Sequence, residues 1–181
     1  MQKKNPVHYV DNAKLYTALI HYKTLCEKAE KKNKQKPQVP DYIAKCFMDI
    51  AVNLATKSQF RNYIFVEDMI YDGIENCIKY ISSFNPDMSN KPFAYFTKAI
   101  YYAFLRRIEK EKKYLYTKYK VIDNSEIFHQ LHVNPSHGGI DIAHDIGYSE
   151  SARSNMNQFV SDYETKQEDK KEKKRQKDDE K

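Results

Sequence analysis

Three carboxylates recur at helical spacing near the middle of the chain. Asp68, Asp72 and Glu75 stand at positions i, i+4 and i+7, so a helix would carry them on one face. Tyr71 and Lys79 lie at the margin of this face. A solvated helix surface commonly has such a pattern. The concentration of acids in an otherwise basic chain also fits a surface that docks a basic partner, and spacing alone leaves both interpretations open.

The segment that follows has the opposite charge. Between positions 91 and 120 the chain holds nine basic residues, two acidic residues and nine of its 24 aromatic residues. Several of them form a stripe apart from the apolar positions: Tyr95, Lys98, Tyr102 and Arg106, beside Thr97 and Tyr101. Cations neutralise phosphates, and aromatic faces stack on unpaired bases. The stripe predicts contact with single-stranded or melted DNA, although an amphipathic helix with tyrosines bordering its core has the same pattern.

Other constellations offer little chemistry. Four histidines lie near two aspartates at a spacing that matches no metal template: His129, His132, His137 and His144, with Asp141 and Asp145. The pair Gly138-Gly139 lacks the Lys-Ser/Thr of a phosphate-binding loop. Cys26, Cys46 and Cys77 include no C-x-x-C pair, so we expect reduced thiols. We therefore expect no enzymatic activity, no metal and no cofactor.

Helices should position these residues, because the chain has only four glycines and six prolines. Apolar residues recur every three or four positions in four segments. The first follows Asp11 or Asn12 and ends in the basic run 31–36, the second follows Asp41 and reaches Leu54, the third covers about 66–84, and the fourth follows Asn90 and reaches about Lys120. The expected N-caps are Asp11 or Asn12, then Asp41, then Asn90 with Pro92 near the first helical position. Residues 57–65 should be a connection with at most one helical turn.

The apolar positions of these four segments form the predicted core. They are Leu15, Leu19, Tyr22, Leu25, Cys26 and Ala29; Tyr42, Ile43, Phe47, Ile50, Ala51 and Leu54; Val66, Met69, Ile70, Ile74, Cys77, Ile78, Ile81 and Phe84; and Phe93, Phe96, Ile100, Ala103, Phe104 and Ile108. We expect a flexible lead over residues 1–10, a helical domain over 11–120 and a loosely ordered extension over 121–164. Residues 140–148 are a candidate short helix. Residues 165–181 contain no apolar residue, so they should be disordered or at most a solvated helix.

The overall charge restricts the kind of partner. The formal net charge is +6 and the isoelectric point is about 9.0, which favours polyanions and nucleic acid first. No apolar run approaches the length of a membrane span, and no signal peptide precedes the helices. We therefore expect no membrane association and a cytoplasmic location.

The two charged segments together resemble a known family. The stretch EDMIYDGIENCIKYISSFNPDMSNKPFAYFTKAIYYAFLRRIEKEKK is similar to region 2 of bacterial sigma factors, and most similar to the late-transcription sigma factors of T-even-type bacteriophages. The resemblance begins near Tyr9 and runs to about Tyr119. It depends on the order of the pieces: an acidic helix, the tripeptide FNP, and a helix that opens with PFAYFT and closes with AFLRRI.

The resemblance implies a role for each face. The helix that begins near Asp68 would dock on the clamp helices of the RNA polymerase β′ subunit, in the host bacterial cytoplasm. The matching contact positions are Asp68, Tyr71, Asp72 and Ile74, and Glu75 extends them. Tyr95 would stack on the flipped adenine of the minus-ten promoter element. The other positions expected to contact DNA are Thr97, Lys98, Tyr101, Tyr102, Leu105 and Arg106.

Two departures from the family are visible. Lys98 and Ala99 replace the tryptophan pair that forms a wedge at the melting fork, and the chain has no tryptophan. Phe96, Tyr101 and Tyr102 are candidate replacements, or an AT-rich promoter makes the wedge unnecessary. The C-terminus lacks the acidic, apolar motif that binds a sliding clamp in the phage family, which leaves residues 159–164 as a weaker candidate for clamp or β-flap contact.

The resemblance therefore implies an all-α protein: a compact sigma-region-2-like helical domain with a flexible, poorly ordered C-terminal tail. It would be a phage-type late sigma factor that binds RNA polymerase core and melts an AT-rich minus-ten-like promoter element. A minus-thirty-five element is not expected, because no second helical domain is present to read it. The β flap, a co-activator and a sliding clamp are further candidate partners. The alternatives are a non-initiating polymerase-binding regulator and a general single-strand binder.

Overall fold

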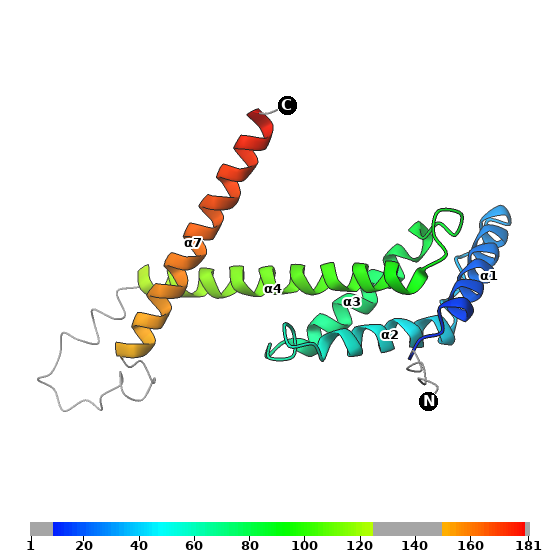
Figure 1. Cartoon of the computed structure of the whole chain (residues 1–181), viewed down its shortest axis with the longest axis horizontal. Helices are drawn as coiled ribbons and strands as arrows, with labels where there is room; N and C mark the ends of the chain where they lie inside the picture. Colours follow the sequence, from blue (N-terminus) through cyan, green and yellow to red (C-terminus); the bar gives the residue numbers. More distant parts are fainter. Residues whose placement is uncertain (1–8, 125–149, 180–181) are drawn as a thin grey trace, which may run out of the picture. The chain divides into compact units, whose positions relative to one another are not determined.

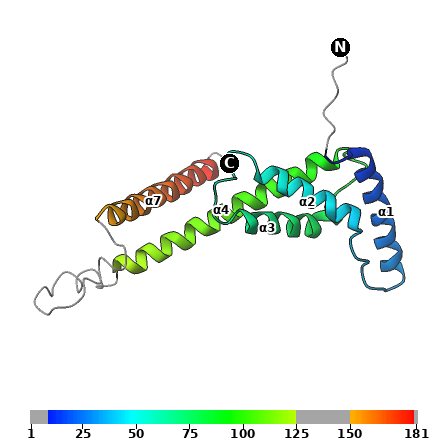
Figure 2. The same cartoon turned by 90° about the horizontal axis from the view of Figure 1, so that it is seen from below.

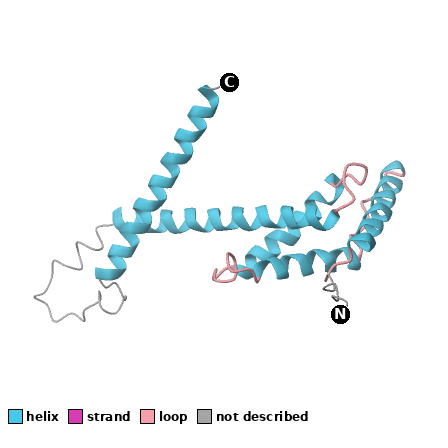
Figure 3. Cartoon of the chain, in the orientation of Figure 1, coloured by secondary structure: helices cyan, strands magenta, loops and turns pink. Residues whose placement is uncertain are grey.

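The computed structural model of the chain describes residues 9–124 and 150–179, and these residues contain helices and no strand (Figures 1 and 3). The helices are α1 (Asn12–Lys31), α2 (Asp41–Ala55), α3 (Val66–Tyr80), the short 3₁₀ helix η1 (Ile81–Ser83), α4 (Pro92–Asn124) and α7 (Glu150–Asp179). The all-α prediction is confirmed. The candidate helix over 140–148 and the histidine group lie outside the described residues. In the described part, no helix has both the length and the apolarity needed to cross a membrane.

The chain divides into two units, Met1–Glu109 and Lys110–Lys181, with the boundary inside α4. We call them the N-terminal unit and the C-terminal unit. Within the N-terminal unit, α2, α3 and the beginning of α4 lie beside one another (Figures 1 and 2). Both predicted functional faces belong to this unit.

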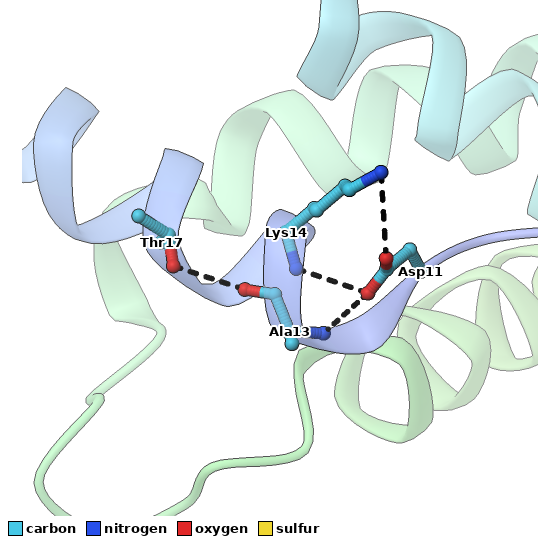
Figure 4. Close-up of polar contacts among 4 residues, drawn as sticks. All are labelled: Asp11, Ala13, Lys14 and Thr17. Atoms are coloured by element: carbon cyan, nitrogen blue, oxygen red, sulfur yellow. Dashed lines mark hydrogen bonds and ion pairs between the residues drawn. The ribbon is translucent and has the colours of Figure 1, made fainter.

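Helix α1 begins where the sequence predicts. The Asp11 carboxylate accepts hydrogen bonds from the backbone N–H groups of Ala13 and Lys14, at 3.0 and 3.1 Å (Figure 4). These hydrogen bonds lower the pKa of Asp11 below its ordinary value, and the bond from Lys14 has the largest effect. Asp11 is therefore the N-cap, and one of the two predicted alternatives is confirmed.

The neighbouring residue Asn12 serves a different helix. Its side-chain oxygen accepts a hydrogen bond from the backbone N–H of Phe93 at 3.2 Å, and its amide nitrogen donates to the carbonyl of Asn90 at 3.0 Å. Pro92 occupies the first position of α4 and has no N–H group, so the Phe93 N–H is the first that needs an acceptor. The sequence predicts Asn90 as this cap. The structure instead places the Asn12 side chain on Phe93, and Asn90 contributes its carbonyl.

Two predicted boundaries are wrong. Pro40, and not Asp41, is the N-cap residue of α2, because Asp41 is already the first helical residue and the carbonyl of Pro40 accepts a hydrogen bond from the Ala44 N–H at 3.1 Å. Asp41 lies in the first turn, where its negative charge interacts favourably with the positive end of the helix dipole. Helix α3 was expected to reach Phe84 but ends at Tyr80, and a 3₁₀ turn follows, which tightens the exit from the helix.

The core follows most of the predicted apolar stripes. The most deeply buried predicted residues, at 0 % exposure, are Leu15, Ile43, Phe47, Ile50, Ala51, Met69, Cys77, Phe96, Ile100 and Phe104. Phe47 and Phe96 join α2 to α4, with ring centroids 4.5 Å apart. Leu25, Tyr42 and Ile78 were predicted in the core but are 37–42 % exposed. They lie at the edges of the apolar stripes of their helices. Each stripe is wider than the helix surface that packs against the neighbouring helices.

Gly73 allows α3 to lie very close to α4. A Cβ atom built at this position would be 2.9 Å from Cγ2 of Ile100 and 3.1 Å from Cε1 of Phe104. Both neighbours are fully buried, so neither can move away freely. One turn further along α3, the Asn76 amide donates to the carbonyl of Ala99 at 3.2 Å. A glycine at this contact therefore sets the distance between the two helices.

In the C-terminal unit the end of α4 pairs with α7. The rings of Tyr116 and Tyr163 stack with centroids 4.6 Å apart. Glu164 accepts a 2.8 Å hydrogen bond from the Tyr116 hydroxyl, and its Oε1 lies 3.0 Å from Lys120 Nζ. Both contacts lower the pKa of Glu164, and that with Lys120 has the larger effect. Of the two alternatives predicted for the charged tail, residues 165–179 adopt the solvated helix. The described residues of the loosely ordered extension, 121–124 and 150–164, are helical as well.

We predict that Gly73→Ala lowers the free energy of unfolding by about 1–3 kcal/mol, because overpacking at Ile100 outweighs the gain in helix propensity. Denaturant unfolding followed by circular dichroism measures this change. In an Ile100→Ala background, where Cγ2 is absent, most of the penalty should disappear, as a double-mutant cycle would reveal. A Gly73→Ala protein as stable as the parent would contradict the close contact.

Candidate functional site

One side of α4 in the N-terminal unit combines cations with aromatic rings. Lys98 and Arg106 are exposed, Tyr102 is 48 % exposed and Leu105 is 36 % exposed, while Tyr95 is half-buried. Their spacing places all five on one face of the helix. Lys98 Nζ lies 5.9 Å from the centroid of the Tyr102 ring, a cation–π distance. We call these five residues the α4 stripe.

Tyr95 is the anchored ring of the stripe. Its ring lies against Phe84, with centroids 5.3 Å apart, and Phe84 itself is buried in the core. Burial, with smaller contributions from Cys77 and Tyr80, raises the pKa of the Tyr95 hydroxyl. The phenol therefore stays neutral at physiological pH, and a neutral ring held at the core edge can stack on another planar group.

Thr97 and Tyr101 differ from the α4 stripe. The Thr97 hydroxyl donates to the carbonyl of Phe93 at 2.7 Å, one turn back in its own helix, and lies away from the stripe. Tyr101 borders the stripe but is half-buried, with its ring 5.7 Å from that of Phe60. Phe96, a candidate for the melting wedge, is fully buried and cannot reach a ligand, which leaves Tyr102 as the most exposed candidate.

The acidic side of α3 lies as the sequence predicts. Tyr71 is 67 % exposed and is flanked by the three carboxylates, whereas Ile74 is half-buried and packs against the core. Glu75 Oε1 lies 2.7 Å from Lys79 Nζ, and their hydrogen bond and charge attraction lower the pKa of Glu75. This pair is exposed at both ends, so it contributes little to stability.

Arg107 on α4 bridges the other two carboxylates. Its Nη2 lies 2.7 Å from Asp68 Oδ2, and its Nη1 lies 3.4 Å from Asp72 Oδ2. The arginine side chain is only 16 % exposed, against 56 % for Asp68 and 38 % for Asp72. In the sequence pattern Arg107 is one of nine basic residues between positions 91 and 120, and its spacing indicates no separate role. Its position three residues after Phe104 and seven after Ile100 places it on the buried side of α4, where a cation needs a carboxylate partner.

Two of the three thiols are buried, and the described residues contain no cluster of potential metal ligands. No group of three or more potential metal ligands comes together in residues 9–124 and 150–179. Cys46 and Cys77 are buried free thiols, and burial raises the pKa of Cys77 to about 12. A protonated, buried thiol is a poor nucleophile, so Cys77 has a packing role.

The sequence matches no protein-family model and no curated protein. Its function is therefore inferred from the two surfaces of the N-terminal unit. An acidic face on α3 and the α4 stripe lie on consecutive helices, and Arg107 connects the helix of one to the carboxylates of the other.

We predict that Arg107→Ala lowers the free energy of unfolding by about 1–2 kcal/mol, because its ion pairs and its buried stem are both lost. The exposed carboxylate ends keep the electrostatic share of this loss small. The matched control is the exposed neighbour, where Arg106→Ala should change stability by no more than about 0.5 kcal/mol. Thermal or denaturant unfolding measures both, and equal effects would rule out a specific role for Arg107.

Proposed function

We propose that this protein is a phage-type late sigma factor, which binds RNA polymerase core and melts an AT-rich minus-ten-like promoter element. The observation that carries the proposal is the pairing of two opposite surfaces on consecutive helices. The acidic face of α3 suits a basic protein, and the α4 stripe suits nucleic acid whose bases are unpaired. The order of these helices is also the order of the pieces that resemble sigma region 2.

The acidic face supports the polymerase-binding part of the proposal. Tyr71 offers a large exposed ring among carboxylates, and such residues act as anchors in protein interfaces. Arg107 neutralises part of the negative charge, but Asp68 remains more than half exposed. A basic coiled coil, such as the clamp helices of β′, could therefore pair with Asp68 and Glu75 while its apolar residues pack on Tyr71.

The α4 stripe supports promoter melting. Tyr95 is held against Phe84, so little conformational entropy is lost when a flipped base stacks on it. Lys98 and Arg106 lie close enough on the same face to neutralise flanking phosphates. Extruding a base from the duplex costs a few kcal/mol, which stacking of about 1–3 kcal/mol per base and this charge would offset.

The sliding clamp, the β flap and a co-activator are the other candidate partners. The segment 159–164 was the candidate for contact with a sliding clamp or the β flap. In the C-terminal unit, Phe159 packs on Tyr119 with ring centroids 5.6 Å apart, and Tyr163 stacks on Tyr116. These rings would have to leave α4 to bind a clamp, so we assign the segment no such role. A co-activator has no assigned surface.

We predict that Tyr71→Ala weakens binding to RNA polymerase core about tenfold, which corresponds to the loss of one interface anchor. Labelled core titrated with the protein measures this affinity. Tyr114→Ala is the matched control, because Tyr114 is 68 % exposed, close to the 67 % of Tyr71, but lies in the other unit. If the unaltered protein does not bind core at all, the single-strand binder becomes the better hypothesis.

We predict that Tyr95→Leu leaves core binding intact and reduces open-complex formation at a TATA-rich promoter about tenfold, because the stacking ring is lost. Leucine keeps an apolar contact with Phe84, and Tyr95→Phe, which keeps the ring, should retain most activity. Permanganate footprinting and run-off transcription with reconstituted core measure the effect. Core binding without promoter-specific transcripts from the unaltered protein would instead favour a non-initiating regulator.

A further inference from the structure

Helix α1 holds both ends of the segment that connects η1 to α4. The beginning of α1 lies beside the beginning of α4 (Figures 1 and 2). Near the start of the connecting segment, the Tyr16 hydroxyl donates to the carbonyl of Pro86 at 3.3 Å. At its end, the Asn12 side chain donates to the carbonyl of Asn90 and accepts from the N–H of Phe93. Asn12 and Tyr16 stand at i, i+4, so one face of α1 makes these contacts.

These contacts adjoin the turn of α4 that carries Tyr95. Pro92 has no N–H group, so Asn12 supplies the acceptor that the next N–H of the helix needs. A backbone hydrogen bond of 3.2 Å from the N–H of Tyr95 to the carbonyl of Lys91 closes this first turn. The first turn of a helix frays most readily, because the fewest backbone bonds hold it. A frayed turn would move the Tyr95 ring away from the buried ring of Phe84.

We propose that Asn12 and Tyr16 are positioning residues, which hold the Tyr95 ring in the orientation that stacks on an unpaired base. A ring that is already ordered loses less entropy on meeting a base than a ring on a frayed turn. Asn12 makes two of the contacts, one of them to α4 itself, so its removal should have the larger effect. The consequence for promoter melting rests on the proposed function, whereas the ordering of Tyr95 does not.

A general loss of stability is the competing explanation, and Asn76 provides the matched control. Its amide donates to the carbonyl of Ala99 on α4 at 3.2 Å, from α3 and at a position beyond Tyr95. Asn76→Ala therefore removes the same chemical group as Asn12→Ala and another contact to the backbone of α4. It leaves the first turn of α4 with its cap.

The first measurement is amide hydrogen exchange of the full chain by NMR, without polymerase or DNA. Asn12→Ala should speed exchange of the Phe93 and Tyr95 N–H groups about fivefold relative to amides in the middle of α4, the usual effect of losing one cap. Asn12→Asp keeps an oxygen that can accept from Phe93, so it should restore most of the protection. Asn76→Ala should leave the relative exchange of the first turn unchanged.

The second measurement is open-complex formation with reconstituted core at a TATA-rich promoter. Asn12→Ala should reduce it about fivefold with core binding unchanged. Tyr16→Phe should reduce it about twofold, the low end for one hydrogen bond. In a Tyr95→Leu background Asn12→Ala should have no further effect, because it acts through the lost ring. Any effect of Asn76→Ala should add fully to that of Tyr95→Leu.

Two outcomes would overturn the inference. Unchanged exchange of the Phe93 and Tyr95 amides in Asn12→Ala would show that Asn12 does not order the first turn. Effects of Asn12→Ala and Tyr95→Leu that simply add would assign Asn12 to stability alone. If the unaltered protein opens no promoter, the proposed function fails. Faster exchange in Asn12→Ala, with a weaker NMR contact between the Tyr95 and Phe84 rings, would then still support the ordering of Tyr95.

Discussion

The close contact between α3 and α4 at Gly73 is the constraint on which the N-terminal unit depends. With no Cβ on α3 at this point, the Ile100 and Phe104 side chains of α4 can lie directly against its backbone. The same approach brings Arg107, one turn beyond Phe104, within 2.7 Å of Asp68. A larger residue at position 73 would separate the helices and with them the two surfaces, so a packing constraint fixes the spacing of the candidate site.

Arg107 gives the acidic face a dual character. Its ion pairs with Asp68 and Asp72 stabilise the α3–α4 contact, but both carboxylates keep enough exposure to meet a partner. Pairs with exposed ends are worth about 0–1 kcal/mol, so a partner's cation can replace the arginine at small cost. The two carboxylates therefore stabilise the α3–α4 contact and are also able to bind a partner. Their spacing in the sequence does not distinguish these two roles.

Local patterns were sufficient to predict the helices and most of the core. The 3.6-residue period identified Phe96, Ile100 and Phe104 as buried, because each helix can bury only one stripe. The sequence could not predict contacts between distant residues. Asn12 caps α4 from 81 positions away, and Arg107 finds a carboxylate 35 positions away. Such partners depend on how helices pack, which no local pattern encodes.

The predicted DNA-contacting residues divide by how firmly the core holds them. The rings of Tyr95 and Tyr101 pack on buried rings. Tyr102 is 48 % exposed, and its ring lies 5.8 Å from that of Tyr101. An anchored ring has already lost its rotamer freedom in the folded chain, so stacking on a base costs it less entropy. A freer ring can follow a separating strand. On physical grounds Tyr95 is therefore suited to hold a flipped base, and Tyr102 to fill the gap that the base leaves.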